Sequence, residues 1–303
     1  MTRVAAVDIG TNSARLLVAD LVDGRLHQVD RRTTITRLGQ GVDAARELHP
    51  DAIARTLDTL RAYGAVIRDL GVRKVRATAT SAARDASNRD AFFDPATDVL
   101  GVRPELLTGE EEARLEFNGA TGGLDVPAPY LVLDVGGGST EFIVGTDEPN
   151  GLVSVDIGCV RLTEQFLGSD PPAPEELSQA LSIVRDHLAD VEREIPGAAL
   201  ANSLIGTAGT IWTMAAVELG ADPTESERIH HFRLTRAAAE DVYRTLATEP
   251  IAQRKHNPGL EAGRVDVIVG GALVVVAVMR HFRFEQMLVS EADILDGLAL
   301  SLA

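Results

Sequence analysis

One pattern occurs twice in this sequence and limits the available folds more than any other feature. In each copy a short apolar run ends in an aspartate and leads into a polar turn that contains glycine. The first run is residues 4–8, ending in Asp8, with its turn at 10–13. The second is residues 130–134, ending in Asp134, with its turn at 136–140. Asp134 follows Asp8 by 126 residues. We therefore expect an internal duplication, with one copy in each of two domains.

The residues around the first copy predict an α/β fold class. Asp23-Gly24 is a strong hairpin signal, so the first 30 residues predict a three-stranded antiparallel meander. A helix is expected from Pro50 to Gly71, then a strand at 72–77, then a second helix from Ser81 towards Phe93. Such alternation after a meander predicts helices layered on a sheet.

The second copy leads into a mainly helical region. We expect a strand at 152–156, helices at 175–194, 210–219, 236–245 and 266–280, a short strand at 286–289 and a last helix from Asp293. A chain of 303 residues has room for two domains. The Gly- and Pro-rich segment 122–129 is the expected crossing between them.

Charge and composition exclude several classes of protein. The 45 acidic residues against 29 Lys and Arg give a formal net charge of −16, which opposes binding to nucleic acid or an anionic membrane. The apolar run at 267–279 is shorter than the ~18 residues of a membrane span, and Asp8 interrupts the first apolar run, so no signal peptide is expected. A single cysteine excludes a disulfide framework and favours a cytoplasmic setting.

The glycine turns indicate phosphate chemistry. A Gly-Ser/Thr turn can direct several backbone N–H groups at an anion, and a carboxylate at the preceding strand end suits Mg²⁺. A third turn of similar composition, 206–210, follows an apolar run and opens a helix. Neither lysine, Lys74 nor Lys255, follows a glycine, which excludes a P-loop. Backbone amides, metal and arginine would have to hold a polyanion.

Segments along nearly the whole chain resemble, in order, the motifs of the exopolyphosphatase/guanosine pentaphosphate phosphatase (Ppx/GppA) family. They are residues 7–13, 80–85, 109–114, 134–141, 158–163, 264–268 and 270–272. The resemblance implies the actin/Hsp70/sugar-kinase superfold, with two ribonuclease-H-like domains, mixed sheets flanked by helices and an interdomain cleft. It places the N-terminal domain at 1–124, completed by the helix 291–303, and the C-terminal domain at 125–290.

The resemblance also implies roles for single residues. Glu112 matches the general base that activates the attacking water. Asp134 and Glu141 match the carboxylates that hold the divalent metal (Mg²⁺ or Mn²⁺), with Asp8 assisting. Arg84 matches an arginine beside the phosphate chain, and Arg15 and Arg161 are weaker candidates. The two phosphate loops are Gly10, Thr11, Asn12 and Ser13, and Gly136, Gly137, Gly138, Ser139 and Thr140.

Other interpretations of these residues stay open. Glu112 could be a solvated acid at a helix start, where Thr108 and Glu111 fit a capping box. Gln165 stands where a cysteine phosphatase using Cys159 would need arginine, and Gly10 stands where an aspartyl-phosphate enzyme would need a second aspartate.

Two further features, both in the last quarter of the chain, are ambiguous. His230-His231 is a candidate substrate contact or a surface turn. Leu295 stands where the family carries an arginine before an acidic residue and glycine, so the preference for substrate length would differ if that arginine contacts long chains.

The expected activity is removal of the terminal phosphate from inorganic polyphosphate, with guanosine pentaphosphate and nucleoside triphosphates as further candidate substrates. Two alternatives stay open: an ATP-dependent kinase or ATPase of the same superfold, and a non-catalytic regulator that binds polyphosphate or alarmone. No nucleic acid or membrane partner is expected. The oligomeric state is open, with a homodimer as one candidate.

Overall fold

The computed structural model describes residues 1–122 and 124–303, and these form two compact units. Unit 1 is Met1–Gly119 together with Ala292–Ala303, and unit 2 is Ala120–Glu291. The expected crossing at 122–129 includes Gly123, which lies outside the described residues. Within the described residues, no helix is both long and apolar enough to span a membrane.

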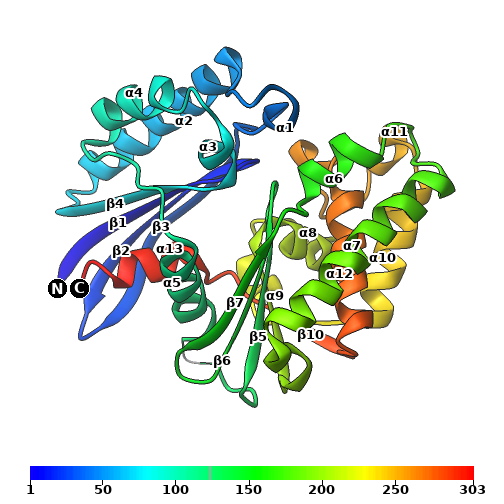
Figure 1. Ribbon diagram of the computed structural model, residues 1–303. Helices are drawn as coiled ribbons and strands as arrows, with labels where there is room; N and C mark the ends of the chain where they lie inside the picture. The colour runs from blue at the N-terminus through cyan, green and yellow to red at the C-terminus, as the bar shows by residue number, and fades with distance from the viewer. Residues whose placement is uncertain (123) are drawn as a thin grey trace. The chain divides into compact units, whose positions relative to one another are not determined.

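Unit 1 is built on a four-stranded sheet in the order β3-β2-β1-β4 (Figure 1). Its strands are β1 (Thr2–Ile9), β2 (Ser13–Val22), β3 (Arg25–Ile35) and β4 (Lys74–Ala79). The first three form the predicted antiparallel meander, and β4 pairs in parallel with β1. Asp23 and Gly24 both have positive φ, 49° and 75°, which is the backbone of the type I′ hairpin turn that their sequence predicts.

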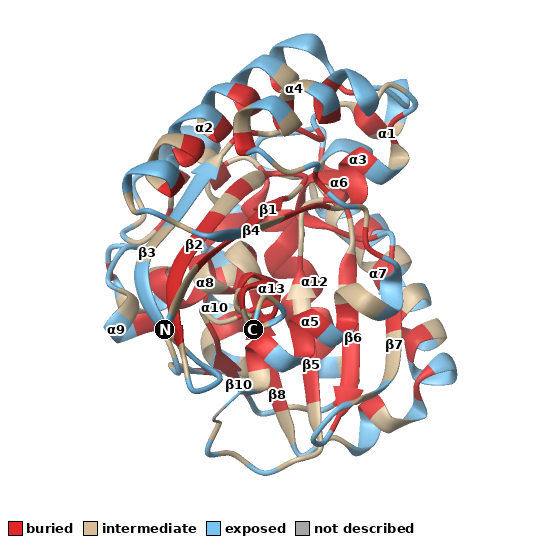
Figure 2. Ribbon diagram, turned by 90° about the vertical axis from the view of Figure 1, so that its left-hand side faces the viewer, coloured by how far each residue is buried: buried red, intermediate tan, exposed pale blue. Residues whose placement is uncertain are grey.

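Helices cover both faces of this sheet. They are α1 (Val42–Ala45), α2 (Pro50–Asp69), α3 (Ser81–Asp85), α4 (Asp90–Leu100), α5 (Gly109–Thr121) and α13 (Ile294–Leu300). Side chains alternate along a strand, so Val7 and Ile9 of β1 pack under α2 and α4, whereas Val4 and Ala6 pack under α5 and α13. Figure 2 shows the strand β3 exposed beside the buried β2. By the same alternation, Asp8 falls on the face that carries α5 and α13.

The prediction of one helix from Ser81 towards Phe93 was wrong, because two helices, α3 and α4, occupy this region. The residues between them bind the backbone of another segment. The Asn88 side chain accepts from Leu48 N at 2.8 Å and donates to Leu48 O at 3.0 Å, and Ser87 N donates to Arg46 O. These hydrogen bonds replace the helical ones and end α3.

The sheet of unit 2 begins with the same strand order as that of unit 1. It is ordered β7-β6-β5-β8-β10-β9, with β5–β6–β7 antiparallel and β8 parallel to β5. Its strands are β5 (Tyr130–Val135), β6 (Thr140–Gly145), β7 (Pro149–Val155), β8 (Ser203–Thr207), β9 (Arg233–Thr235) and β10 (Gln286–Val289). The repeated order β7-β6-β5-β8 agrees with the predicted duplication. The three-residue β9 was not predicted.

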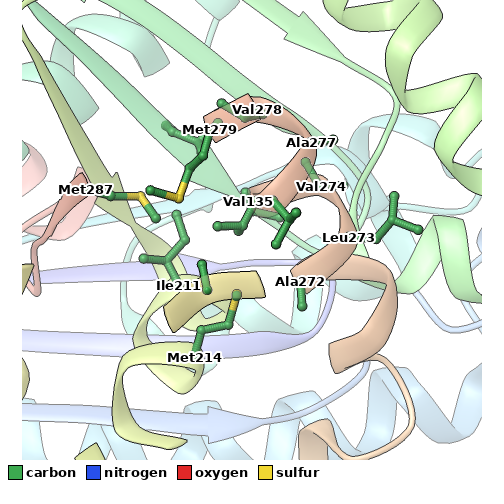
Figure 3. Close-up of a cluster of buried hydrophobic side chains, with 14 of the residues drawn as sticks. Val135, Ile211, Met214, Ala272, Leu273, Val274, Ala277, Val278, Met279 and Met287 are labelled. Atoms are coloured by element: carbon green, nitrogen blue, oxygen red, sulfur yellow. The ribbon is translucent and has the colours of Figure 1, made fainter. Parts of the chain in front are cut away.

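Helices cover one face of this second sheet. They are α6 (Cys159–Phe166), α7 (Pro174–Glu194), α8 (Ala208–Leu219), α9 (Ser226–Ile229), α10 (Arg236–Thr248), α11 (Ile251–Arg254) and α12 (Ile268–His281), with 3₁₀ turns at Pro196–Leu200 and Ala262–Arg264. Every residue of α12 from Ile268 to Met279 is buried. Figure 3 shows side chains of α12, α8, β5 and β10 gathered in this core, including Met214, Met279 and Met287. The apolar run at 267–279 is therefore a core helix.

Candidate active site

The carboxylate of Asp8 lies at the buried end of β1 and is held by two neighbours. Arg15 lies directly opposite Asp8 on β2. It donates to Asp8 Oδ2 from Nε at 3.1 Å and from Nη2 at 2.7 Å. Thr78, its partner on β4, donates from Oγ1 to Asp8 Oδ1 at 3.4 Å. Asp8 is 3% exposed, so these hydrogen bonds replace the water that a carboxylate needs.

Glu112 lies in the first turn of α5, where the helix start fixes its position. Thr108 accepts from Glu111 N at 3.2 Å, which confirms Thr108 as the predicted N-cap. The Glu111 side chain pairs with Arg76. Glu112 therefore differs from its two acidic neighbours: Glu110 is exposed, whereas the Glu112 side chain is 15% exposed. Glu112 does lie at the helix start, but its low exposure disagrees with the interpretation as a solvated acid.

Arg84 and Asp8 set the charge environment of Glu112. Arg84, at the end of α3, donates from Nη2 to Glu112 Oε2 at 2.7 Å. Burial raises the pKa of Glu112 above its ordinary value, the positive charge of Arg84 opposes that rise, and the negative charge of Asp8 adds to it. A mostly buried carboxylate whose pKa is raised, in the electrostatic field of a second carboxylate, has the properties of a general base.

The first glycine turn is held by the segment that follows β3. Gly10 N donates to Ser13 O at 2.8 Å and closes the turn. Asn12 O accepts from the N–H groups of Thr36 and Arg37 at 3.0 and 2.9 Å. In a trans peptide the N–H points opposite to the C=O, so the N–H of Ser13 points away from this segment. Thr11 and Asn12 are 7% and 5% exposed as whole residues, so their side chains are little accessible to a ligand.

The second glycine turn has the same closing hydrogen bond. Gly136 N donates to Ser139 O at 3.0 Å, and a Cβ on Gly136 would lie 3.1 Å from that oxygen, the same distance as for Gly10 and Ser13 O. Thr140 Oγ1 donates to Ile157 O and anchors the end of the turn. The two predicted loops therefore close with the same backbone hydrogen bond, from a glycine N–H to the carbonyl of the serine three residues later.

The start of α6 orients this second turn. The carbonyls of Gly136 and Gly137 accept from the N–H groups of residues 159–161 at 2.9 to 3.1 Å. The N–H groups of Gly137 and Gly138 consequently point away from α6, where they can meet an anion. A Cβ on Gly158 would overlap the backbone of Gly137, so only glycine lets α6 approach this closely.

Asp134 and Glu141 are direct partners across β5 and β6. Directly opposite side chains lie on one face of a sheet with Cβ atoms about 4.5–5.5 Å apart, so the two carboxylates are neighbours. Both residues are partly exposed, and Ser154 donates to Glu141 Oε1 at 2.8 Å. Among the described residues there is no group of three or more His, Cys, Asp or Glu placed to hold a metal ion.

Comparison with known proteins identifies the family. Residues 17–303 match the Ppx/GppA phosphatase family. Exopolyphosphatase 2 of Mycobacterium tuberculosis is 46% identical to this chain over 317 residues, which cover 100% of this chain and 99% of the relative. The chain belongs to the Ppx/GppA phosphatase family.

Solved structures of Ppx/GppA proteins agree with the fold described above. An exopolyphosphatase-like protein superposes with a TM-score of 0.94 at 35% identity, covering 100% of this chain and 98% of its own. The Aquifex aeolicus member of the Ppx/GppA family gives a TM-score of 0.83 at 31% identity, covering 99% and 97%. The predicted family and fold class are confirmed.

The third turn, residues 206–210, contains a strained residue, and a buried arginine packs against this turn. Ala208, at the start of α8, has φ of 63°, in the left-handed region that non-glycine residues avoid. The guanidinium of Arg264 packs against Gly209, where a Cβ would overlap it, and its Nε donates to Glu261 at 2.6 Å. The Arg264 side chain is 7% exposed. The sequence motif marked Arg264 but did not place it at this turn.

The other candidate residues named from the sequence have contacts within the protein itself. Cys159 is buried, and burial raises the pKa of its thiol, as for a core cysteine. Leu295 packs in the core between the sheet and α13. The rings of His230 and His231 stack with centroids 3.7 Å apart, and His230 Nδ1 accepts from Glu291 N. Arg161 forms an ion pair with Asp156.

Unit 1 thus brings together Asp8, Arg15, Arg84 and Glu112, and unit 2 brings Asp134 and Glu141 beside each other. The predicted cleft between the units stays a prediction. Sequence reasoning missed Asp293, whose Oδ2 accepts from Arg15 Nη1. Its only sequence signal is that of a helix N-cap, because Arg15 lies 278 residues earlier in the chain.

Proposed function

We propose that this protein is an exopolyphosphatase, which hydrolyses the terminal phosphoanhydride bond of inorganic polyphosphate. The observation that carries the proposal is the environment of Glu112, a nearly buried carboxylate bonded to Arg84 in the electrostatic field of Asp8. Membership of the Ppx/GppA family supports it, as does the name of the Mycobacterium tuberculosis relative.

In the proposed reaction Glu112 accepts a proton from a water molecule as the water oxygen attacks the terminal phosphorus. The bond from that phosphorus to its bridging oxygen breaks, so the products are inorganic phosphate and a polyphosphate shorter by one unit. General base catalysis of this kind contributes about 10²–10⁴-fold to the rate. Arg84, on the Oε2 side of Glu112, favours the ionised form of that carboxylate and is available to a phosphate oxygen.

Backbone N–H groups and arginines would hold the substrate. Each glycine turn presents N–H groups that point away from the segment holding it, which suits the oxygens of a phosphate chain. This accounts for binding of a polyanion by a chain with net charge −16, because the positive character is local to the turns, to Arg84 and to Arg264.

The residues of unit 2 fit a divalent cation. Asp134 and Glu141 offer hard carboxylate oxygens side by side on adjacent strands, and Mg²⁺ typically binds one or two carboxylates with water and substrate phosphate as its other ligands. Mg²⁺ or Mn²⁺ bound there would neutralise charge on the phosphate oxygens. Asp8 fits this role less well, because Arg15 and Thr78 already occupy both of its oxygens.

The test is release of phosphate from polyphosphates of defined length, with Mg²⁺, with Mn²⁺ and with EDTA. Guanosine pentaphosphate and ATP are assayed alongside, since both end in the same kind of phosphoanhydride. We expect phosphate release from polyphosphate that EDTA abolishes. Phosphorylation of an acceptor by ATP would indicate a kinase instead, and tight binding of polyphosphate without phosphate release would indicate a regulator.

The setting and assembly of the enzyme belong to the same proposal. We infer a cytoplasmic enzyme that acts on polyphosphate without a nucleic acid or membrane partner, with a homodimer as the assembly to test. Light scattering of the purified full chain measures the assembly, and fractionation of cells that express it measures the location.

A further inference from the structure

Arg15 joins two buried aspartates that are distant in sequence. It donates to Asp8 Oδ2 from Nε and Nη2, and to Asp293 Oδ2 from Nη1. The side chains of Asp8, Arg15 and Asp293 are 4%, 15% and 3% exposed. One guanidinium therefore supplies charge compensation to two carboxylates that water hardly reaches.

Asp293 uses its two oxygens for different purposes. Oδ1 accepts from Leu295 N at 2.9 Å and caps the start of α13. Oδ2 binds Arg15. Because the cap fixes the side chain in one orientation, Oδ2 is held facing Arg15, and Arg15 in turn is held facing Asp8.

The helix that carries Glu112 is packed onto the same residue. A Cβ on Gly119 of α5 would overlap the carbonyl oxygen of Asp293, and Glu116 Oε2 accepts from Ile294 N at 2.8 Å. Glu112 and Glu116 are one helical turn apart on α5, so they lie on the same side of the helix. Asp293 thus links the start of α13 to two elements. It contacts α5 directly, and through Arg15 of β2 it is connected to Asp8 at the end of β1.

We propose that Asp293 is a positioning residue for the reaction: through Arg15 it holds the Asp8 carboxylate in its orientation beside Glu112. This inference rests on the proposed function, because Asp8 and Glu112 are the groups whose placement it explains. Because the Asp293 side chain is 3% exposed and both of its oxygens are bound within the protein, we assign it no contact with substrate.

The chain contains a matched control for this arrangement. Arg3 and Asp20 form a second Arg–Asp pair between the same two strands, with hydrogen bonds of 2.9 and 2.8 Å, at the other end of β1. Asp20→Asn removes a bidentate pair of similar chemistry far from Asp8. Asp293→Asn keeps an oxygen for the N-cap, since asparagine is a good N-cap residue, but can place an NH₂ group against the Arg15 donors.

The experiment compares kcat, KM and thermal stability of these two variants with polyphosphate as substrate. We expect Asp293→Asn to lower kcat about 10- to 100-fold with little change in KM, since small displacements of acting groups cost rates of this size. Asp20→Asn should keep the wild-type kcat. If Asp293→Asn does not fold, Asp293→Ser, which also caps a helix, takes its place.

A double-mutant cycle separates positioning from general damage. If Asp293 acts through Arg15, then Asp293→Asn combined with Arg15→Gln should reduce kcat no further than Arg15→Gln alone. A further readout needs no turnover: the Arg15 Nη1–H group, which donates to Asp293 Oδ2, should be protected from exchange in the wild type and unprotected in Asp293→Asn, with its resonance assigned by its loss in Arg15→Lys.

Three results would overturn the inference: wild-type kcat in Asp293→Asn, multiplicative losses in the double variant, or an equal loss in Asp20→Asn. Each of them presupposes an active wild-type enzyme. Absence of phosphate release from the wild type would instead reject the proposed function, and the resonance measurement would still decide whether Asp293 holds Arg15.

Discussion

Glu112 is held between two opposing effects at the scale of a single side chain. Burial and the charge of Asp8 raise its pKa, whereas the hydrogen bond and charge of Arg84 lower it, and burial is the largest of these causes. The ionised form is therefore less favourable in the folded protein than in water. A base in this condition has more driving force to take a proton, at a cost in stability.

The first prediction concerns Glu112→Gln. Turnover of polyphosphate should fall about 10²–10⁴-fold, because the general base is lost. The folded state binds the Glu112 proton more tightly than the unfolded state, so this residue lowers stability as pH rises from the ordinary glutamate value through the raised pKa. The variant should thus be at least as stable as wild type at pH 8, with the difference vanishing below the ordinary value. Thermal melts at both pH values measure this.

Glu110→Gln is the control for that prediction. It makes the same change two residues earlier, on an exposed side chain in the same first turn of α5. Its turnover and melting temperature should match those of the wild type. An active Glu112→Gln enzyme would remove Glu112 from the mechanism.

The second prediction uses the effect of Arg84 on pH dependence. In the wild type, the acid limb of kcat/KM should lie above the ordinary glutamate pKa, since the base must be deprotonated to act. Arg84→Met removes the group that lowers the pKa of Glu112, so the acid limb should move to higher pH. A pH–rate profile measures the shift. Arg103→Met, which removes an arginine paired with Asp90 and Asp94, should leave the profile unchanged.

Sequence reasoning reached the residues of the site unevenly, for a physical reason. Asp8, Glu112 and the glycine turns belong to short segments whose order along the chain carries a recognisable motif. The link from Arg15 to Asp293 joins positions at opposite ends of the chain, and only the tertiary fold brings them together. The burial of Thr11 and Asn12 likewise depends on a segment that packs from elsewhere, residues 36–39.

At the scale of elements, α5 and α13 cross through a pair of glycines. A Cβ on Gly297 would overlap Leu115 O, and a Cβ on Gly119 would overlap Asp293 O. Leu115 precedes Gly119 on one helix while Asp293 precedes Gly297 on the other, so the two helices run antiparallel at the contact. The crossing is close because neither helix has a side chain there.

The third prediction is that Gly119→Ala destabilises the protein by on the order of 1–3 kcal/mol or more. The added methyl group meets backbone, which cannot rotate away as a side chain can, so the helices must separate. Denaturant unfolding measures the loss. Gly168→Ala is the control, since its Cβ would meet only a Glu176 carboxylate oxygen at 3.5 Å, an ordinary contact. Equal stability of the two variants would contradict the close crossing.

Most elements could be predicted because they carry local signals. Pro50 begins α2, Thr108 caps α5 and Asp293 caps α13, as their sequence positions indicate. Two of the failures have clear tertiary causes. The break between α3 and α4 depends on hydrogen bonds to residues 46–48, and the three-residue β9 is a strand only because it pairs with β10.

At the scale of the whole molecule, the duplicated pattern became a duplicated structure. Both units have a meander followed by a parallel strand, and both close their first turn with a glycine N–H to a serine carbonyl three residues later. The units then diverge, since unit 2 extends its sheet by β10 and β9. The repeat in the sequence predicted the shared part, and it contains no information on the added strands.

The C-terminal segment is a part of unit 1 although unit 2 separates it from the rest in sequence. Ile294, Leu295 and Leu298 are 4%, 1% and 0% exposed and complete the core over β1 and β2. Burial of such side chains contributes about 1.5–3 kcal/mol each, so loss of all three is comparable in size to the net stability of about 5–15 kcal/mol of a typical domain.

The fourth prediction follows from this arrangement. A chain ending at Glu291 should lose the folded state of unit 1 while unit 2 stays folded, because unit 2 is one continuous segment with its own core. Hydrogen exchange measured by mass spectrometry should then show fast exchange in β1, β2 and α5 and protection in β5, β8 and α12. Removal of Ala303 alone should change neither pattern, since this residue is exposed. Protection of β1 in the chain ending at Glu291 would show that unit 1 folds without α13, and uniform loss of protection would show that the two units fold as one.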